Sequence, residues 1–127
     1  YNYILQDENT NYGIVHTLDG YDEISLTGSF KLFTKNEEKL ISPEEIGQTR
    51  LKQSDIFGGN SVKEAAKIFK NIIQGKGTNA QNNVVLTNTA FALGIVNEHK
   101  SFEDAFAEAK ESLFGLKAKN CLDKLVN

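Results

Sequence analysis

Three carboxylates lie close together in the N-terminal third of the chain. Asp19, Asp22 and Glu23 belong to the run Asp19-Gly20-Tyr21-Asp22-Glu23. Carboxylate oxygens suit hard divalent cations such as magnesium, which typically takes one or two carboxylates and completes its shell with water and substrate phosphates. Asp22 and Glu23 are adjacent, so in a regular strand they would point to opposite faces. A metal shared by these two residues therefore requires a loop.

The same carboxylates also have a purely structural interpretation, because acidic side chains at a turn are often simply hydrated. Asp19-Gly20 is a turn signal in its own right, since glycine tolerates the positive φ of tight turns. The residues alone leave a metal site and a solvated turn as open alternatives at Asp22 and Glu23.

A glycine pair, Gly58-Gly59, precedes a predicted helix N-terminus, where free N–H groups could meet an anion. The segment matches neither the dinucleotide-binding pattern nor the P-loop pattern. We therefore favour the simpler interpretation, in which the glycines turn the chain into a helix capped by Ser61.

The remaining chemically capable residues are isolated from one another. His16 ends a predicted strand, His99 lies in a polar loop, and neither has a second ligand at zinc spacing. The single cysteine, Cys121, cannot form an intrachain disulfide and falls on the apolar face of a predicted helix, where we expect a packed, inert thiol. No G-x-S-x-G elbow or Ser–His–Asp arrangement emerges, so we predict no catalytic nucleophile in this segment.

The elements that must position the carboxylates are short strands in the first half of the chain. Residues 12–16, 24–27 and 30–34 are rich in β-branched and aromatic side chains or alternate between apolar and polar. We predict strands there, with a glycine turn at residues 17–20 and a charged turn at residues 36–39.

The second half predicts helices. Ser42-Pro43-Glu44-Glu45 is a capping box with proline at the first helical position, and it predicts one short helix. Ser61 and Glu64 begin a helix with an apolar stripe over residues 62–73, and Gly75 stands where a C-terminal glycine belongs.

Three further helical segments are predicted at residues 82–96, 101–113 and 118–125. Residues 90–96 are apolar all round, so we expect this helix to be central and buried. No repeat or linker divides the chain, and residues 1–127 are predicted to form one segment.

The overall composition excludes several classes of protein. The chain has 127 residues, 39% hydrophobic and 24% charged, with a net charge of -3. Such a balance fits a folded chain and gives little attraction to nucleic acid or an anionic membrane. The sequence begins at Tyr1 and contains no methionine, so we expect that either an N-terminal segment has been removed or the chain is the tail of a longer protein.

Four segments, in order, resemble the anthranilate phosphoribosyltransferase family. Val15–Gly28 resembles the family's VHGxDGLDEIS-x-TG segment, and Ser42–Gly47 resembles its PEE-hydrophobic-G segment. Gly58–Ala66 resembles its GGD…ENA segment, and Gln81–Ala90 resembles its D-x-VLLNAA segment. Thr17 replaces the usual glycine, Tyr21 the usual leucine, and Ala65 a common asparagine. None of these departures removes a carboxylate.

The resemblance implies roles for the acidic residues. Asp22 and Glu23 correspond to the family's magnesium-binding pair, whereas Asp19 would shape the turn. Family members transfer a phosphoribosyl group from phosphoribosyl pyrophosphate (PRPP) to the amine of anthranilate, in tryptophan biosynthesis. The full-length enzyme is expected to be a cytoplasmic homodimer with Mg²⁺ as cofactor.

The resemblance also implies an α/β fold, namely the C-terminal part of a phosphoribosyltransferase/nucleoside-phosphorylase-like α/β domain. Residues 1–6 would then end a helix rather than form a strand. The family's N-terminal helical domain and its glycine-rich substrate loop are absent from these 127 residues, so we expect the chain alone to be inactive.

Two alternatives remain open from the sequence. The segment could belong to a related nucleoside phosphorylase-like protein, or it could be a non-catalytic module that binds phosphate or a metal ion. The upstream glycine-rich loop and anthranilate contacts would distinguish the first alternative, and titration with magnesium and PRPP the second.

Overall fold

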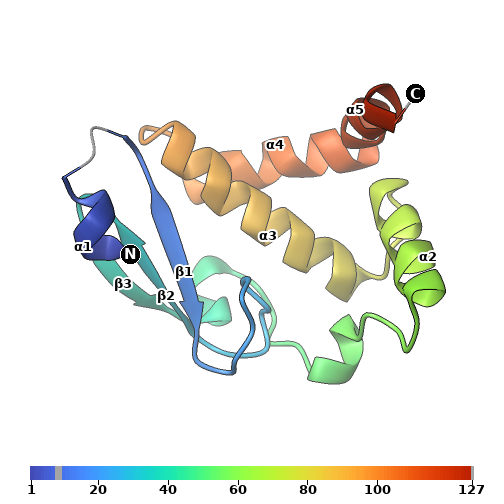
Figure 1. Cartoon of the computed structure of the whole chain (residues 1–127), viewed down its shortest axis with the longest axis horizontal. Coiled ribbons are helices and arrows are strands. Elements are labelled where there is room, and N and C mark those ends of the chain that lie inside the picture. Colours follow the sequence, from blue (N-terminus) through green and yellow to red (C-terminus); the bar gives the residue numbers. More distant parts are fainter. Residues whose placement is uncertain (8–9, 127) are drawn as a thin grey trace.

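A computed structural model describes residues 1–7 and 10–126, and it has the predicted α/β order of strands followed by helices (Figure 1). The polar stretch at residues 6–11 lies partly outside the described residues. The elements are α1 (Asn2–Leu5), β1 (Gly13–Thr17), β2 (Phe30–Thr34), β3 (Glu38–Ile41), the 3-10 helices η1 (Pro43–Ile46) and η2 (Gln53–Ile56), α2 (Val62–Ile73), α3 (Asn79–Val96), α4 (Phe102–Phe114) and α5 (Lys117–Val126).

The strands form an antiparallel sheet in the order β1-β2-β3. Val15 lies opposite Leu32 in the β1–β2 pair, and Lys31 lies opposite Leu40 in the β2–β3 pair. The predicted strands at residues 12–16 and 30–34 are thus confirmed to within one residue.

Strand β3 was not predicted, and the proposed turn at residues 36–39 is wrong at its second half. The hairpin closes earlier, where the Thr34 N–H donates to the Glu37 carbonyl at 2.9 Å. Glu38 and Lys39 then enter the strand. Their charges are compatible with pairing because β3 is an edge strand, where charged side chains remain in water and discourage further strand addition.

The predicted strand at residues 24–27 is also wrong, because this segment is irregular. Leu26 has a φ of +61°, which is outside the extended region. Ser25 and Thr27 bond to the Asp19 carboxylate instead of joining a strand ladder. The apolar residues of the segment are nevertheless core residues, since Ile24 and Leu26 are both fully buried.

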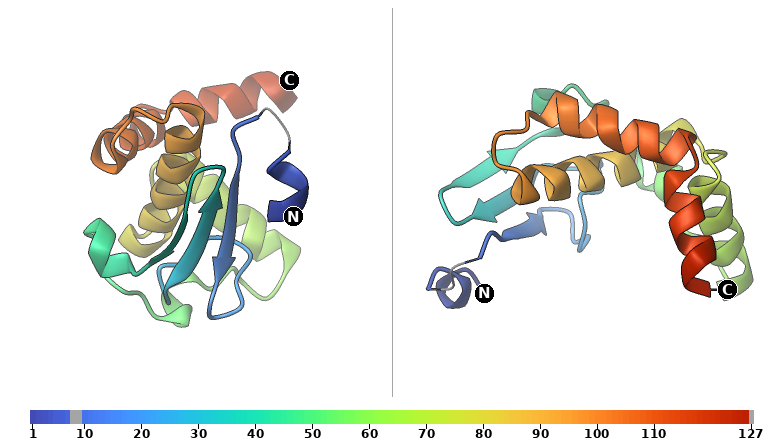
Figure 2. Two further views of the ribbon diagram at one scale, coloured as in Figure 1. Left: turned by 90° about the vertical axis from the view of Figure 1, so that its left-hand side faces the viewer. Right: turned by 90° about the horizontal axis from the view of Figure 1, so that it is seen from above.

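Helix α3 lies between the sheet and α4 (Figure 2). On the sheet side, its Phe91 ring meets Phe30 edge-on with centroids 5.4 Å apart. On the other side, Leu86 packs with Ala109 and Leu113 of α4. The central position predicted for this helix is confirmed, but complete burial is not, because Val96 at its end is 80% exposed.

Side-chain caps explain where the helices begin. The Ser61 hydroxyl accepts the Glu64 N–H at 3.2 Å, as predicted, and Ser101 caps α4 in the same way. Thr78 accepts the Gln81 N–H and starts α3 at Asn79, three residues before the predicted Asn82.

Helices α2 and α5 lie at the end of the molecule away from the sheet (Figure 1). No residue of α2 is buried in the described part of the chain, and Val62 on its predicted apolar stripe is 88% exposed. Cys121 of α5 is also exposed, so the prediction of a packed thiol is wrong. Within residues 1–7 and 10–126, no helix has the length and apolarity that crossing a membrane demands.

Candidate functional site

The candidate site is the loop that joins β1 to β2, beyond the carboxyl end of β1 (Figure 1). Asp22 and Glu23 lie in bends of this loop, and both side chains are exposed. The loop conformation removes the geometric obstacle raised by their adjacency, since these residues are not held on opposite faces of a strand.

Asp19 has a different environment from the exposed pair. Its Oδ2 accepts the Ser25 hydroxyl at 3.3 Å and also the Thr27 hydroxyl. The two hydroxyl oxygens are 2.9 Å apart, and the Ser25 hydroxyl accepts the Thr27 N–H. Asp19 therefore closes the loop on itself, which is the shaping role that the family resemblance implied for it.

Backbone bonds and one buried hydroxyl close the base of the loop. The Leu18 N–H donates to the Ser29 carbonyl at 3.0 Å, next to the last rung of the β1–β2 pair. The hydroxyl of buried Thr17 donates to the Tyr21 carbonyl. Thr17 stands where the family usually has glycine, so this departure adds a hydrogen bond to the turn.

Asn88 of α3 holds the far side of the loop. Its Oδ1 accepts the Ile24 N–H at 3.0 Å, and its Nδ2 donates to the Ile24 carbonyl at 2.8 Å. Sequence reasoning missed this residue as part of the site. The available signal was an amide within the otherwise apolar and small stretch at residues 84–96.

A second brace comes from the segment after η1. The Leu51 N–H donates to the Leu26 carbonyl at 2.9 Å. The preceding residue, Arg50, makes two hydrogen bonds with the Glu44 carboxylate, at 3.0 and 3.1 Å. These bonds hold the pKa of Glu44 below its ordinary value and, with a smaller contribution from the negative charge of Asp19, raise the pKa of Arg50.

The donor set fits magnesium. Asp22 and Glu23 supply hard carboxylate oxygens, and both remain accessible to a ligand from solvent. Across the described ranges, no group of three or more His, Cys, Asp or Glu side chains could hold a metal ion. An ion at this pair would therefore complete its shell with water or phosphate oxygens, as magnesium usually does.

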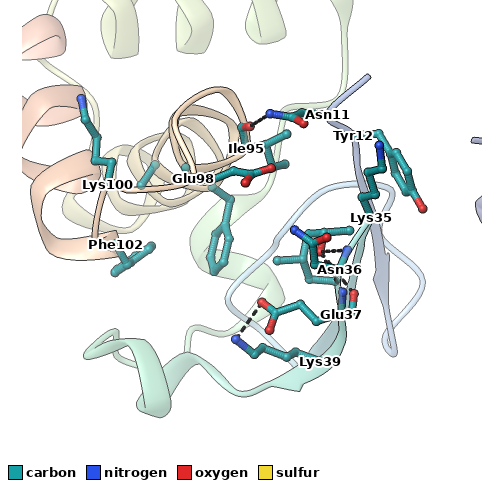
Figure 3. A pocket seen from close by; sticks show the side chains of 15 residues that line it. Asn11, Tyr12, Lys35, Asn36, Glu37, Lys39, Ile95, Glu98, Lys100 and Phe102 are labelled. Atoms are coloured by element: carbon teal, nitrogen blue, oxygen red, sulfur yellow. Dashed lines mark hydrogen bonds and ion pairs between the residues drawn. The ribbon is translucent and has the colours of Figure 1, made fainter. Parts of the chain in front are cut away.

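Hollows on the described surface lie both away from the loop and beside it. One, of about 500 Å³, separates the β2–β3 turn from the corner between α3 and α4, and Phe91, Phe102, Glu37 and Lys39 are among its lining (Figure 3). It does not include the Asp22–Glu23 pair. Another, of about 530 Å³, lies beside the loop and is lined by Tyr21, Gln53, Ser54, Ile56, Phe57 and Gly58.

Of the other sequence candidates, the glycine pair comes near this loop, since Gly58 lines the second hollow together with Tyr21. At Gly58-Gly59, the Asn60 N–H donates to the Glu64 carboxylate at 2.7 Å, so the start of α2 is occupied by its own cap. This supports the structural interpretation of the glycines. His99 is exposed in the turn between α3 and α4, and His16 is exposed on β1.

A family model described as glycosyl transferase family, a/b domain, matches residues 2–118. The chain belongs to this family. Among curated members, it is 50% identical over 125 residues to the anthranilate phosphoribosyltransferase of Flavobacterium johnsoniae, covering 98% of this chain and 38% of that protein. It is 44% identical over 126 residues to the enzyme of the same name from Bacteroides fragilis, covering 99% and 38%. The chain thus spans well under half the length of these glycosyl transferase relatives.

Solved structures confirm the glycosyl transferase α/β fold. The anthranilate phosphoribosyltransferase from Saccharomyces cerevisiae in complex with PRPP and Mg has a TM-score of 0.77 at 20% identity, over 89% of this chain and 32% of that one. The enzyme from Thermus thermophilus has a TM-score of 0.76 at 22% identity, over 90% and 34%. At such identities the likeness supports the fold of this chain and not its individual site residues.

Proposed function

We propose that the chain is the C-terminal part of an anthranilate phosphoribosyltransferase and that Asp22 and Glu23 hold its magnesium ion. The observation that carries the proposal is the exposed carboxylate pair in a loop braced from three sides. The naming of the relatives that are 44% and 50% identical supports the reaction. The other part of the enzyme would supply the PRPP cradle and the anthranilate pocket.

The proposed reaction explains why carboxylates are needed at this position. Breaking the bond between the ribose C1 and the diphosphate leaves a leaving group rich in negative charge. Magnesium, when bound, neutralises part of that charge and orients the diphosphate. Asp22 and Glu23 would bind the ion and attack nothing, while Asp19 keeps the turn in shape through Ser25 and Thr27.

The metal-binding role of Asp22 and Glu23 is tested by Asp22→Ala combined with Glu23→Ala in the full-length protein. Both side chains are exposed, so thermal unfolding should change little, whereas phosphoribosyl transfer to anthranilate should fall by roughly a hundredfold or more at limiting magnesium. The matched control is Glu37→Ala with Glu38→Ala, which removes two adjacent exposed carboxylates from the β2–β3 hairpin.

Normal turnover of the Asp22/Glu23 double variant at limiting magnesium would overturn the metal assignment. Activity of the full-length wild type with a nucleoside and phosphate, and none with anthranilate, would instead favour the nucleoside phosphorylase-like alternative. Homodimer formation and cytoplasmic location of the full-length enzyme stay predictions.

A further inference from the structure

We propose that Asn88 is a positioning residue that sets the geometry of the Asp22–Glu23 pair by fixing the backbone of Ile24. The inference rests on the proposed function, because the pair must bind magnesium for its geometry to matter. Asn88 itself would touch neither the ion nor a substrate.

All the polar groups of the Asn88 amide have partners. Its amide satisfies both backbone groups of Ile24, accepting from the N–H at 3.0 Å and donating to the carbonyl at 2.8 Å. The second Nδ2 hydrogen can serve the Val84 carbonyl one helical turn earlier, at 2.9 Å. This third bond fixes the amide orientation relative to α3, so the contact to Ile24 is made by a group that cannot swing freely.

Ile24 joins the exposed acidic pair to the core. It directly follows Glu23, and its side chain is fully buried, in the cluster formed with Leu26, Phe30 and Leu32. The chain therefore passes from an exposed acidic pair to a core residue within a single peptide unit. Because the peptide between Glu23 and Ile24 is held in place, the backbone torsions of Glu23 are restricted.

Helix α3 is a suitable reference for this purpose. It packs against both the sheet and α4, so its position is set by the core and not by the loop. The Asp19 bonds to Ser25 and Thr27, in contrast, close the loop only on itself. Asn88 links the loop to the body of the domain at the residue nearest to the pair.

Removing the Asn88 amide would leave two buried backbone groups without partners. Such groups regain hydrogen bonds only by reaching water, and the local chain must move for that to happen. We therefore expect Asn88→Ala to loosen the peptide after Glu23 and to spread the two carboxylates over several arrangements. Magnesium binding would weaken even though both carboxylates are still present.

The experiment compares Asn88→Ala with two variants of the same helix in the full-length protein. Asn82→Ala removes a buried amide that donates to the Gly77 carbonyl at 3.1 Å, between one and two helical turns before Asn88. Thr89→Ala removes a bond to the Val85 carbonyl one turn earlier, like the Asn88–Val84 bond, and leaves the two Asn88 bonds to Ile24 in place. Four quantities are measured for each variant: the melting temperature, the half-saturating magnesium concentration for phosphoribosyl transfer, the hydrogen exchange of a peptide covering residues 21–27, and the affinity for Mn²⁺ alone.

The expected result separates positioning from general stability. Asn88→Ala should raise the half-saturating magnesium concentration about tenfold, speed hydrogen exchange in residues 21–27, and weaken binding of Mn²⁺ alone, followed by its free-ion resonance signal. Asn82→Ala should lower the melting temperature about as much as Asn88→Ala does, but it should change the half-saturating magnesium concentration by no more than about twofold. Thr89→Ala should change none of these quantities appreciably.

A second variant covers the case in which Asn88→Ala does not fold. Asn88→Asp keeps an acceptor for the Ile24 N–H but replaces the donor with a carboxylate oxygen that repels the Ile24 carbonyl. It should show the same direction of change in the magnesium requirement. An unchanged magnesium requirement in either folded Asn88 variant would overturn the positioning role. The proposed function would fail separately, if the Asp22/Glu23 double variant kept its magnesium response.

Discussion

Gly28 lies directly against the carboxylate of Asp19. A β-carbon added at Gly28 would stand 2.9 Å from Asp19 Oδ2 and 3.1 Å from its Cγ. The same Oδ2 accepts the Ser25 and Thr27 hydroxyls, so the carboxylate cannot retreat without breaking those bonds. The absence of a side chain at Gly28 is therefore part of the loop's construction.

We expect Gly28→Ala to displace the Asp19 carboxylate and open the loop. The strain of accommodating an extra carbon in a packed site typically costs about 1–3 kcal/mol. In the full-length protein, urea unfolding should show that the free energy of unfolding falls by an amount in this range. The half-saturating magnesium concentration for phosphoribosyl transfer should rise. The control is Gly94→Ala on α3, where an added β-carbon meets no atom within 4 Å. Equal stability of the two alanine variants would contradict the packing argument.

The contact between α3 and α4 can be tested at two adjacent positions. Leu86 is 3% exposed and packs with Ala109 and Leu113, whereas its neighbour Val85 is 37% exposed. Leu86→Ala should lower the free energy of unfolding by about 2–5 kcal/mol, because it removes buried methyl groups and leaves a cavity. Val85→Ala should cost clearly less in the same denaturation experiment. If the order were reversed, the assigned face of α3 would be wrong.

The capping box of η1 gives a pH-dependent stability. Glu45 accepts the Ser42 backbone N–H at 2.6 Å and its hydroxyl at 2.8 Å, and these bonds hold the pKa of Glu45 below its ordinary value of 4.5. Because the pKa is lowered in the folded state, the stabilisation is present above pH 4.5 and is lost as the pH falls through the folded-state value. Wild type should therefore be more stable than Glu45→Gln at pH 7, and the difference should shrink in acid.

Ser42→Ala provides the matched variant for this pH effect. It removes the hydroxyl but keeps the backbone N–H, which makes the larger contribution to the lowered pKa of Glu45. Most of the acid dependence should survive in Ser42→Ala and disappear in Glu45→Gln. A difference in unfolding free energy between wild type and Glu45→Gln that stays constant as the pH falls from neutral to well below the ordinary Glu45 pKa of 4.5 would refute the prediction.

The 127-residue chain alone should have no measurable anthranilate phosphoribosyltransferase activity. Holding reactants in one geometry supplies a large part of an enzymatic rate, and this chain carries only the proposed metal-binding corner. Magnesium gives up its water reluctantly, so two carboxylates without substrate phosphates should bind it weakly. Assay of the purified chain against a full-length relative checks this, and turnover at a comparable rate would exclude the proposed division of labour.

The strands and helices that carry strong local signals were predictable from the sequence. Ser61 and Ser101 cap helices at the expected residues, and Gly75 has a φ of +71° after α2. Strand β3 was missed because its first residues are charged. Such side chains are tolerated at a sheet edge, where they stay in water, but they do not give the apolar–polar alternation by which a strand is predicted. Residues 24–27 were wrongly predicted to be a strand because they do alternate between apolar and polar. Their alternation comes from two buried side chains and two hydroxyls that bind Asp19.

The candidate site was predictable only in part. The order of Asp19, Gly20, Asp22 and Glu23 located the loop and set Asp19 apart through the family resemblance. The bracing residue Asn88 is 64 positions away from Ile24 and could not be paired with it from periodicity. Contacts of this kind depend on where two elements meet in space, which local pattern does not determine.

The exposed apolar side chains of α2 leave this helix with little tertiary support. The helix has 12 residues and no buried side chain, and an isolated helix of that length is marginal in water. The Ser61 cap adds about 1 kcal/mol, which does not replace the tertiary packing that normally stabilises an amphipathic helix. Its amides should therefore open at a far lower free energy than those of α3, which hydrogen exchange of residues 62–73 and 79–96 would measure.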